Sequence, residues 1–144
     1  MSDEHFIGPH GYRVQGKLIR LTPRGTLTAA DAQALTQVYE RQIARYGRLM
    51  VLSDLRHSGI RATPEARRCL VDWLKRTGHA RQMLGAGFGG GALQAATITL
   101  LLGAARMLVS HAPTVKLFTE EAAALAWLSE QDPTLLDDTA DAPK

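Results

Sequence analysis

The sequence predicts a single-domain α/β protein with a mixed five-stranded sheet and about four helices. Two short segments of alternating hydrophobicity, joined by a tight turn, open the chain. The pattern of a strand followed by a helix then occurs three times, which is typical of a sheet with parallel strands. At 144 residues the chain has the length of one domain and can bury a core without metals or disulfides.

The opening hairpin consists of residues 12–14 and 17–21, with Gln15-Gly16 between them. This connection is too short for the crossover that parallel strands need, so the two strands must be antiparallel. The sheet is therefore predicted to be mixed.

The first helix is predicted to begin at Thr28, because Asp31 three residues later completes a capping box, and to end at Gly47. Its predicted buried face has the spacing of a helix and consists of Leu35, Val38, Tyr39, Ile43 and Tyr46.

Residues 48–52 are apolar after the first position and predict a strand with both faces covered. The second helix is predicted to begin at the cap Thr63, with Pro64 at its first position, and to end at Gly78. Its predicted inner stripe is Ala66, Cys69, Leu70, Trp73 and Leu74, which places Cys69 in the core.

The rest of the chain predicts a weak strand at residues 82–86, a third helix at 93–109 and a strand at 115–118. A last helix is predicted to begin at the cap Thr119. The predicted boundaries are a lead at 1–9, the domain at 10–131 and an acidic, disordered tail at 132–144.

Composition predicts a cytoplasmic protein. Cys69 is the single cysteine and has no internal disulfide partner, and the polar, acidic residues 1–5 do not resemble a secretory signal. The longest apolar stretch, residues 92–109, contains Gln94 and Arg106, so a buried helix is favoured over a transmembrane segment.

Charge is distributed unevenly along the chain. Residues 41–81 carry ten Lys or Arg against three acidic residues, a net charge of +7, whereas residues 119–144 have a net charge of −6. The basic block can attract phosphate, an acidic partner or an anionic membrane surface. It lacks the interleaved aromatic residues of a single-strand platform, so nucleic-acid binding is disfavoured.

Two motifs resemble the STAS superfamily and, within it, the SpoIIAA-like branch. They are residues 20–28, where a hydrophobic strand leads through Gly25-Thr26-Leu27-Thr28 into a helix, and residues 51–55, a strand ending in Asp54-Leu55. The resemblance extends over residues 10–131. It implies a non-catalytic regulatory or binding module whose protein partner contacts the loop after the third strand.

The resemblance also implies a regulatory serine at the start of the second helix, which a partner kinase phosphorylates in STAS proteins. This serine is absent here, since Pro64 stands at its position. Phosphorylation of Thr63 or Ser58 in its place stays open, although Thr63 also fits a purely structural cap. The candidates for binding a partner or an anion are Asp54, Arg56, His57, Ser58, Arg61, Thr63, Arg67 and Arg68.

A run of glycines follows the predicted fourth strand: Gly85, Gly87, Gly89, Gly90 and Gly91. Three of them have the dinucleotide spacing G-x-G-x-x-G, but residues 82–118 contain no acidic residue to bind a ribose. A flexible connection is therefore favoured over a phosphate cradle. No cofactor is predicted, and nucleotide binding is the least favoured function.

The predicted third helix is apolar on almost every side, whereas a surface helix of an α/β domain has a polar face. Its excess apolar surface predicts a second protomer in a homodimer, a lipophilic ligand or a membrane surface as its partner. The resemblance also implies lipophilic ligands and dimers. The candidate contact residues are Leu93, Ile98, Leu101, Leu102 and Met107.

No catalytic constellation is found in the sequence. The five histidines are scattered without an i,i+4 pair, metal-ligand spacing is absent, and there is no Gly-x-Ser-x-Gly elbow. The sequence therefore predicts a non-enzymatic protein with no catalytic residues and no metal. Its first predicted function is regulatory binding of a protein partner, and the alternative is binding of a lipophilic molecule or a membrane surface.

Overall fold

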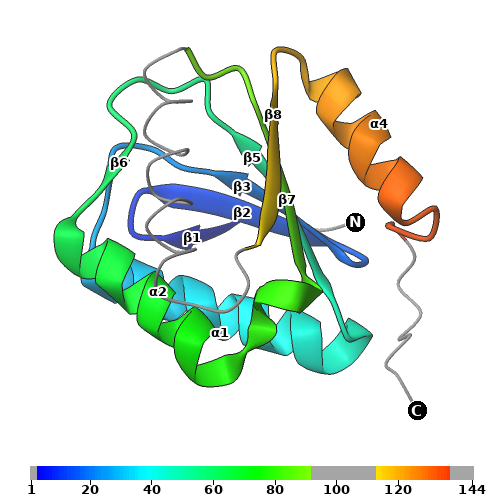
Figure 1. Ribbon diagram of the computed structural model, residues 1–144. Coiled ribbons are helices and arrows are strands. Elements are labelled where there is room, and N and C mark those ends of the chain that lie inside the picture. Colours follow the sequence, from blue (N-terminus) through cyan, green and yellow to red (C-terminus); the bar gives the residue numbers. More distant parts are fainter. Residues whose placement is uncertain (1–2, 92–112, 137–144) are drawn as a thin grey trace.

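The computed structural model describes residues 3–91 and 113–136, and its main feature is a mixed six-stranded sheet (Figure 1). Starting from one edge of the sheet, the first two pairs of neighbouring strands are antiparallel and the other three pairs are parallel, which confirms the mixed sheet. In spatial order the strands are β1 (His5–Ile7), β2 (His10–Gln15), β3 (Leu18–Thr22), β5 (Leu49–Asp54), β7 (Met83–Phe88) and β8 (Thr114–Phe118).

Helices cover both faces of this sheet. Helices α1 (Ala29–Tyr46) and α2 (Pro64–Thr77) contact each other on one face, and α4 (Glu121–Gln131) covers the other (Figure 1). A short 3-10 helix, η1 (His79–Gln82), follows α2. Beside the main sheet, β4 (Thr26–Leu27) and β6 (Arg61–Ala62) form a separate parallel pair.

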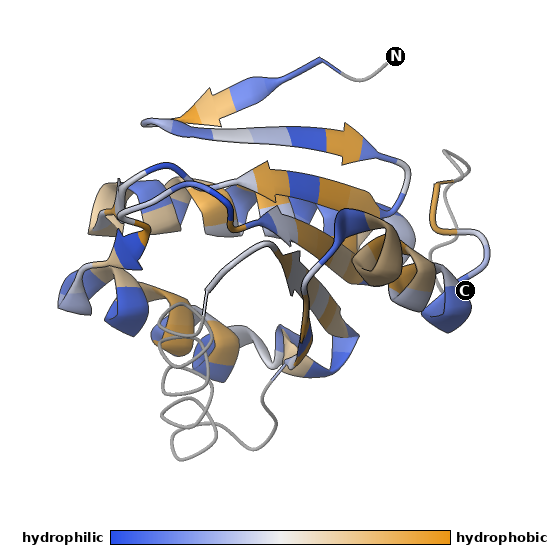
Figure 2. Cartoon of the chain, turned by 90° about the horizontal axis from the view of Figure 1, so that it is seen from above, coloured by the Kyte–Doolittle hydropathy of each residue, from blue (hydrophilic) through white to orange (hydrophobic). Residues whose placement is uncertain are grey.

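The core is divided between the two faces of the sheet, as the side-chain alternation of a strand requires. In β5, Leu49 and Val51 join the cluster beneath α1 and α2, whereas Met50 and Leu52 join the cluster beneath α4. The hydrophobic colour of Figure 2 is prominent on these central strands. No helix among the described residues is long and apolar enough to cross a membrane.

Two of the three predicted helix caps are confirmed. Thr28 and Asp31 form the predicted capping box, and Thr63 accepts a hydrogen bond from the backbone N–H of Ala66. The two helices end at Gly47 and Gly78, whose φ angles of 76° and 70° lie in the left-handed region that glycine adopts readily.

The predicted cap at Thr119 is wrong. Glu120 is the N-cap residue of α4, with an extended backbone and no side-chain capping bond. The helix begins one residue later than the Thr signal indicated because Glu120, through its carbonyl, accepts the first bond from the backbone N–H of Ala124.

The ends of the domain also differ from the prediction. Strand β1 lies inside the predicted lead at 1–9; it was missed because it has three residues and Ile7 alone is buried. The predicted disorder of the tail is wrong for residues 132–136, where Asp132 and Leu135 are buried. Residues 137–144 lie outside the described residues, and so does the segment between the glycine run and β8, residues 92–112.

That segment, residues 92–112, contains the predicted third helix. The candidate residues Leu93, Ile98, Leu101, Leu102 and Met107 therefore lie outside the described residues. Within α2, Cys69 is half-buried, so its predicted place in the core is wrong, and Val71 is buried instead.

Candidate functional site

The loop after β5 is organised by Asp54 and Arg56. Asp54 accepts hydrogen bonds from the backbone N–H of Arg56 at 3.0 Å, from its Nε at 2.9 Å and from its Nη2 at 2.8 Å. The guanidinium carbon of Arg56 also lies 5.3 Å from the centre of the Phe88 ring. The hydrogen bond from Arg56 lowers the pKa of Asp54, although partial burial opposes this effect. Asp54 therefore orders the loop and binds two of the guanidinium nitrogens of Arg56.

The other predicted residues of this region have different surroundings. His57 and Ser58 are exposed in the loop, and Arg68 is exposed on α2. Arg67 donates from Nη1 to the carbonyl of Ala62 at 2.7 Å, and the Thr63 hydroxyl oxygen caps α2. Arg61, Thr63 and Arg67 thus lie in β6 or just after it, whereas His57 and Ser58 lie before it, in the loop that follows β5.

The predicted glycine loop is wrong for Gly85 and Gly87, because both lie within strand β7. A side chain at Gly87 would lie 2.8 Å from Leu55 and 3.0 Å from Leu117, and one at Gly85 would lie 3.3 Å from Val115. These two glycines therefore make room for neighbouring apolar side chains. Gly89, Gly90 and Gly91 follow the strand, and Gly89 has a φ angle of 79°.

The two strand glycines also line an apolar cavity. Gly85 pairs with Val51, and Gly87 pairs with Ser53, so both occupy positions on the sheet face that turns toward α1 and α2. They line a cavity of about 270 Å³ between the sheet and the helices. Other residues that line it include Tyr39, Val71, Trp73, Leu74, Val115 and Leu117.

A second apolar cavity of about 250 Å³ adjoins the first. Its lining includes Ile7, Leu21, Leu27 and Ile60 and reaches the β4–β6 pair. The two cavities have four lining residues in common: Leu35, Tyr39, Leu55 and Leu70. Sequence reasoning missed both cavities, because their linings combine residues that lie far apart in the chain.

Polar side chains are few around these cavities. The first has Ser53 and the hydroxyl of Tyr39, whose pKa is raised because the residue is buried. The second has His10 and Arg61. The described lining of both cavities is otherwise apolar, as is typical of sites for lipophilic molecules.

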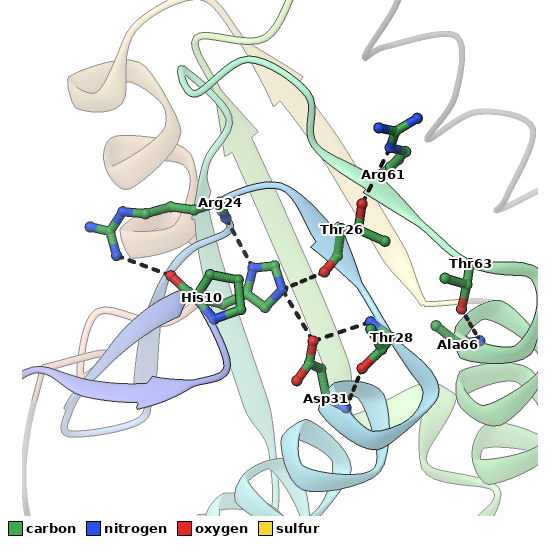
Figure 3. Close-up of polar contacts among 9 residues, drawn as sticks. His10, Arg24, Thr26, Thr28, Asp31, Arg61, Thr63 and Ala66 are labelled. Carbon is green, nitrogen blue, oxygen red and sulfur yellow. Dashed lines mark hydrogen bonds and ion pairs between the residues drawn. The ribbon is translucent and has the colours of Figure 1, made fainter.

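His10 is fully used by the fold (Figure 3). Its Nδ1 accepts the backbone N–H of Arg24 at 2.9 Å, so the ring proton is on Nε2, which faces the carbonyl of Thr26 at 3.2 Å. Nε2 also lies 3.6 Å from Asp31, the capping residue of α1. This histidine joins three segments of chain and has no ring nitrogen left to act as a base.

Comparisons with known proteins agree with this architecture. A family model described as SpoIIAA-like matches residues 18–129. The chain is also similar to the crystal structure of an uncharacterised protein with a SpoIIAA-like fold from Shewanella loihica PV-4, with a TM-score of 0.54, 19% identity and coverage of 89% of this chain and 92% of that one. At this identity the structural likeness establishes the fold alone. No curated protein matches the chain.

Proposed function

This chain belongs to the SpoIIAA-like family, and we propose that it binds a lipophilic small molecule in the two adjoining cavities between its sheet and helices α1 and α2. The observation that supports the proposal is the pair of apolar cavities, about 270 and 250 Å³ in volume, with a common wall. Each is far larger than the space one water molecule needs, and their few polar groups offer water few partners. Transfer of an apolar molecule from water into this site would lower the free energy of the system.

The common wall is the place to test the proposal, because one substitution there affects both cavities. Leu70 is half-buried on α2 and lines both. Leu70→Trp is expected to fill the space and weaken binding of the uncharged fluorescent probe N-phenyl-1-naphthylamine at least tenfold. Fluorescence titration of the purified protein measures the effect.

Lys75→Trp is the matched control, since Lys75 is exposed on the same helix and lines neither cavity. It adds the same indole and should bind the probe as the parent protein does. Leu70→Phe adds less bulk, and it serves if overpacking by tryptophan disrupts the fold. Equal probe binding by all four proteins, with unchanged circular dichroism, would contradict the proposal.

A second candidate function is regulatory binding of a protein partner at the loop after β5. The observation that favours it is that Arg56, His57, Ser58 and Gly59 are exposed together, in a loop whose start is ordered by the Asp54–Arg56 ion pair. A pre-ordered loop loses less conformational entropy when a partner binds.

The double variant His57→Glu, Arg68→Glu is expected to weaken partner binding at least tenfold while leaving the melting temperature nearly unchanged, because exposed charges contribute little to stability. Partners captured from lysate would be identified by mass spectrometry, purified and titrated against both proteins. Identical affinities would exclude this surface.

A further inference from the structure

Arg61 is distinct from every other residue that lines the two cavities. It is the one Arg or Lys among the described lining residues, and both ring nitrogens of His10 face groups of the fold. No Asp or Glu lines either cavity within the described residues. The second cavity therefore combines an apolar interior with a single cation.

The backbone and the inner part of the Arg61 side chain are fixed in place. Its N–H donates to the carbonyl of Gly25 at 3.2 Å as part of the β4–β6 pair. Its Nε donates to the hydroxyl of Thr26 at 3.3 Å (Figure 3). This anchoring reduces the entropy that the side chain would lose on binding a ligand.

The terminal nitrogens of Arg61 remain available. Neither Nη atom has a hydrogen-bond or ion-pair partner among the described residues, and the residue is exposed. Nearby arginines differ, because Arg56 is bound by Asp54 and Arg67 donates to the carbonyl of Ala62. Arg61 thus presents donors that the fold itself does not use.

From this arrangement we infer that the ligand is an apolar molecule carrying a carboxylate, with its apolar part in the second cavity and its carboxylate on Arg61. This assignment rests on the proposed lipophilic-ligand function. A guanidinium is planar and binds carboxylates through charge-assisted, often paired hydrogen bonds, and Nη1 and Nη2 can supply them. The apolar lining holds the tail, and the carboxylate stays near the surface, where its desolvation cost is small.

Two probes of equal chain length separate the carboxylate contact from burial of the tail. Decanoate and 1-decanol are titrated at pH 8 by displacement of N-phenyl-1-naphthylamine from the parent protein, Arg61→Gln and the control Arg76→Gln. Arg76 is exposed on α2 and lines neither cavity, so this control removes the same charge elsewhere.

Arg61→Gln is expected to weaken decanoate binding about tenfold or more while changing decanol binding less than twofold, and Arg76→Gln should match the parent protein for both. The decanoate affinity of the parent protein should also fall with added salt, because the contact is partly exposed.

If Arg61→Gln leaves decanoate binding unchanged while both probes bind, the carboxylate assignment is overturned and the lipophilic-ligand function stands. An equal loss for decanoate in Arg61→Gln and Arg76→Gln also overturns it, since general charge would then be the cause. If neither the naphthylamine probe nor the two decyl compounds bind the parent protein, the proposed function itself fails.

Discussion

Asp132→Asn is expected to lower the free energy of unfolding by about 3 kcal/mol, which is typical for breaking a buried ion pair. Asp132 is buried at the end of α4 and accepts a hydrogen bond from buried Lys17 at 3.2 Å. Its other oxygen accepts two bonds from Thr134, and Lys17 also donates to the Thr134 hydroxyl at 2.6 Å. The carboxylate thus joins the β2–β3 turn to the C-terminal segment. A backbone hydrogen bond from the N–H of Lys17 to the carbonyl of Leu135 reinforces this connection.

Arg48→Gln is the matched control for this prediction. Arg48 contacts the same carboxylate oxygen at the same distance, 3.2 Å, but 43% of its side chain is exposed. Water can replace much of that contact, so the expected loss is below about 1 kcal/mol. Urea unfolding monitored by circular dichroism measures both variants, and similar losses for the two would show that burial of the pair is not the cause.

The effect of Asp132→Asn should depend on pH. Burial opposes ionisation of Asp132, but hydrogen bonds from Thr134 and Lys17 outweigh burial and hold its pKa below the ordinary range. Its stabilisation is therefore fully present above the unfolded pKa of about 3.9 and is lost as pH falls through the lower folded pKa. The difference in stability between parent and variant should be constant from pH 5 to 7 and shrink below about pH 4. A difference that stays constant down to pH 2 would contradict a role for the charge.

The sequence predicted those parts of the fold that depend on neighbouring residues. The capping box of Thr28 and Asp31, the Thr63-Pro64 helix start and the Gly16 turn each act within a few positions, so their chemistry can be recognised without a structure. The family resemblance was confirmed over residues 18–129, which contain both of the motifs that indicated it.

The features that were missed depend on residues far apart in the chain. Lys17 and Asp132 are 115 positions apart, and nothing local marks the segment after α4 as part of the domain. The lining of the first cavity includes Gly85 and Gly87, which the strand pairing places opposite Val51 and Ser53, on the face beneath the helices. The spacing of the same glycines indicated a loop, because glycines at alternate positions of a strand have the same sequence pattern as the start of a nucleotide-binding loop.

Trp73 connects the stability of the domain to the proposed binding site. It is buried, and its ring centre lies 6.0 Å from that of Tyr39 and 5.6 Å from that of His79. Its Nε1 donates to Glu40 at 2.8 Å, and the other oxygen of Glu40 lies 3.2 Å from His79. These contacts join α1, α2 and η1 where Trp73 also lines the first cavity.

Trp73→Ala is expected to lower the free energy of unfolding by about 4 kcal/mol, because it removes a large buried ring and leaves a void beside an existing cavity. Trp73→Phe retains most of the apolar contact and loses the hydrogen bond to Glu40, whose half-exposed carboxylate can turn to water, so about 1–2 kcal/mol is expected. Urea unfolding followed by circular dichroism compares the two variants with Glu40→Gln, which retains an oxygen able to accept the indole N–H and should cost least. If the alanine and phenylalanine variants unfold at the same urea concentration, the aromatic ring at this position does not stabilise the wall of the cavity.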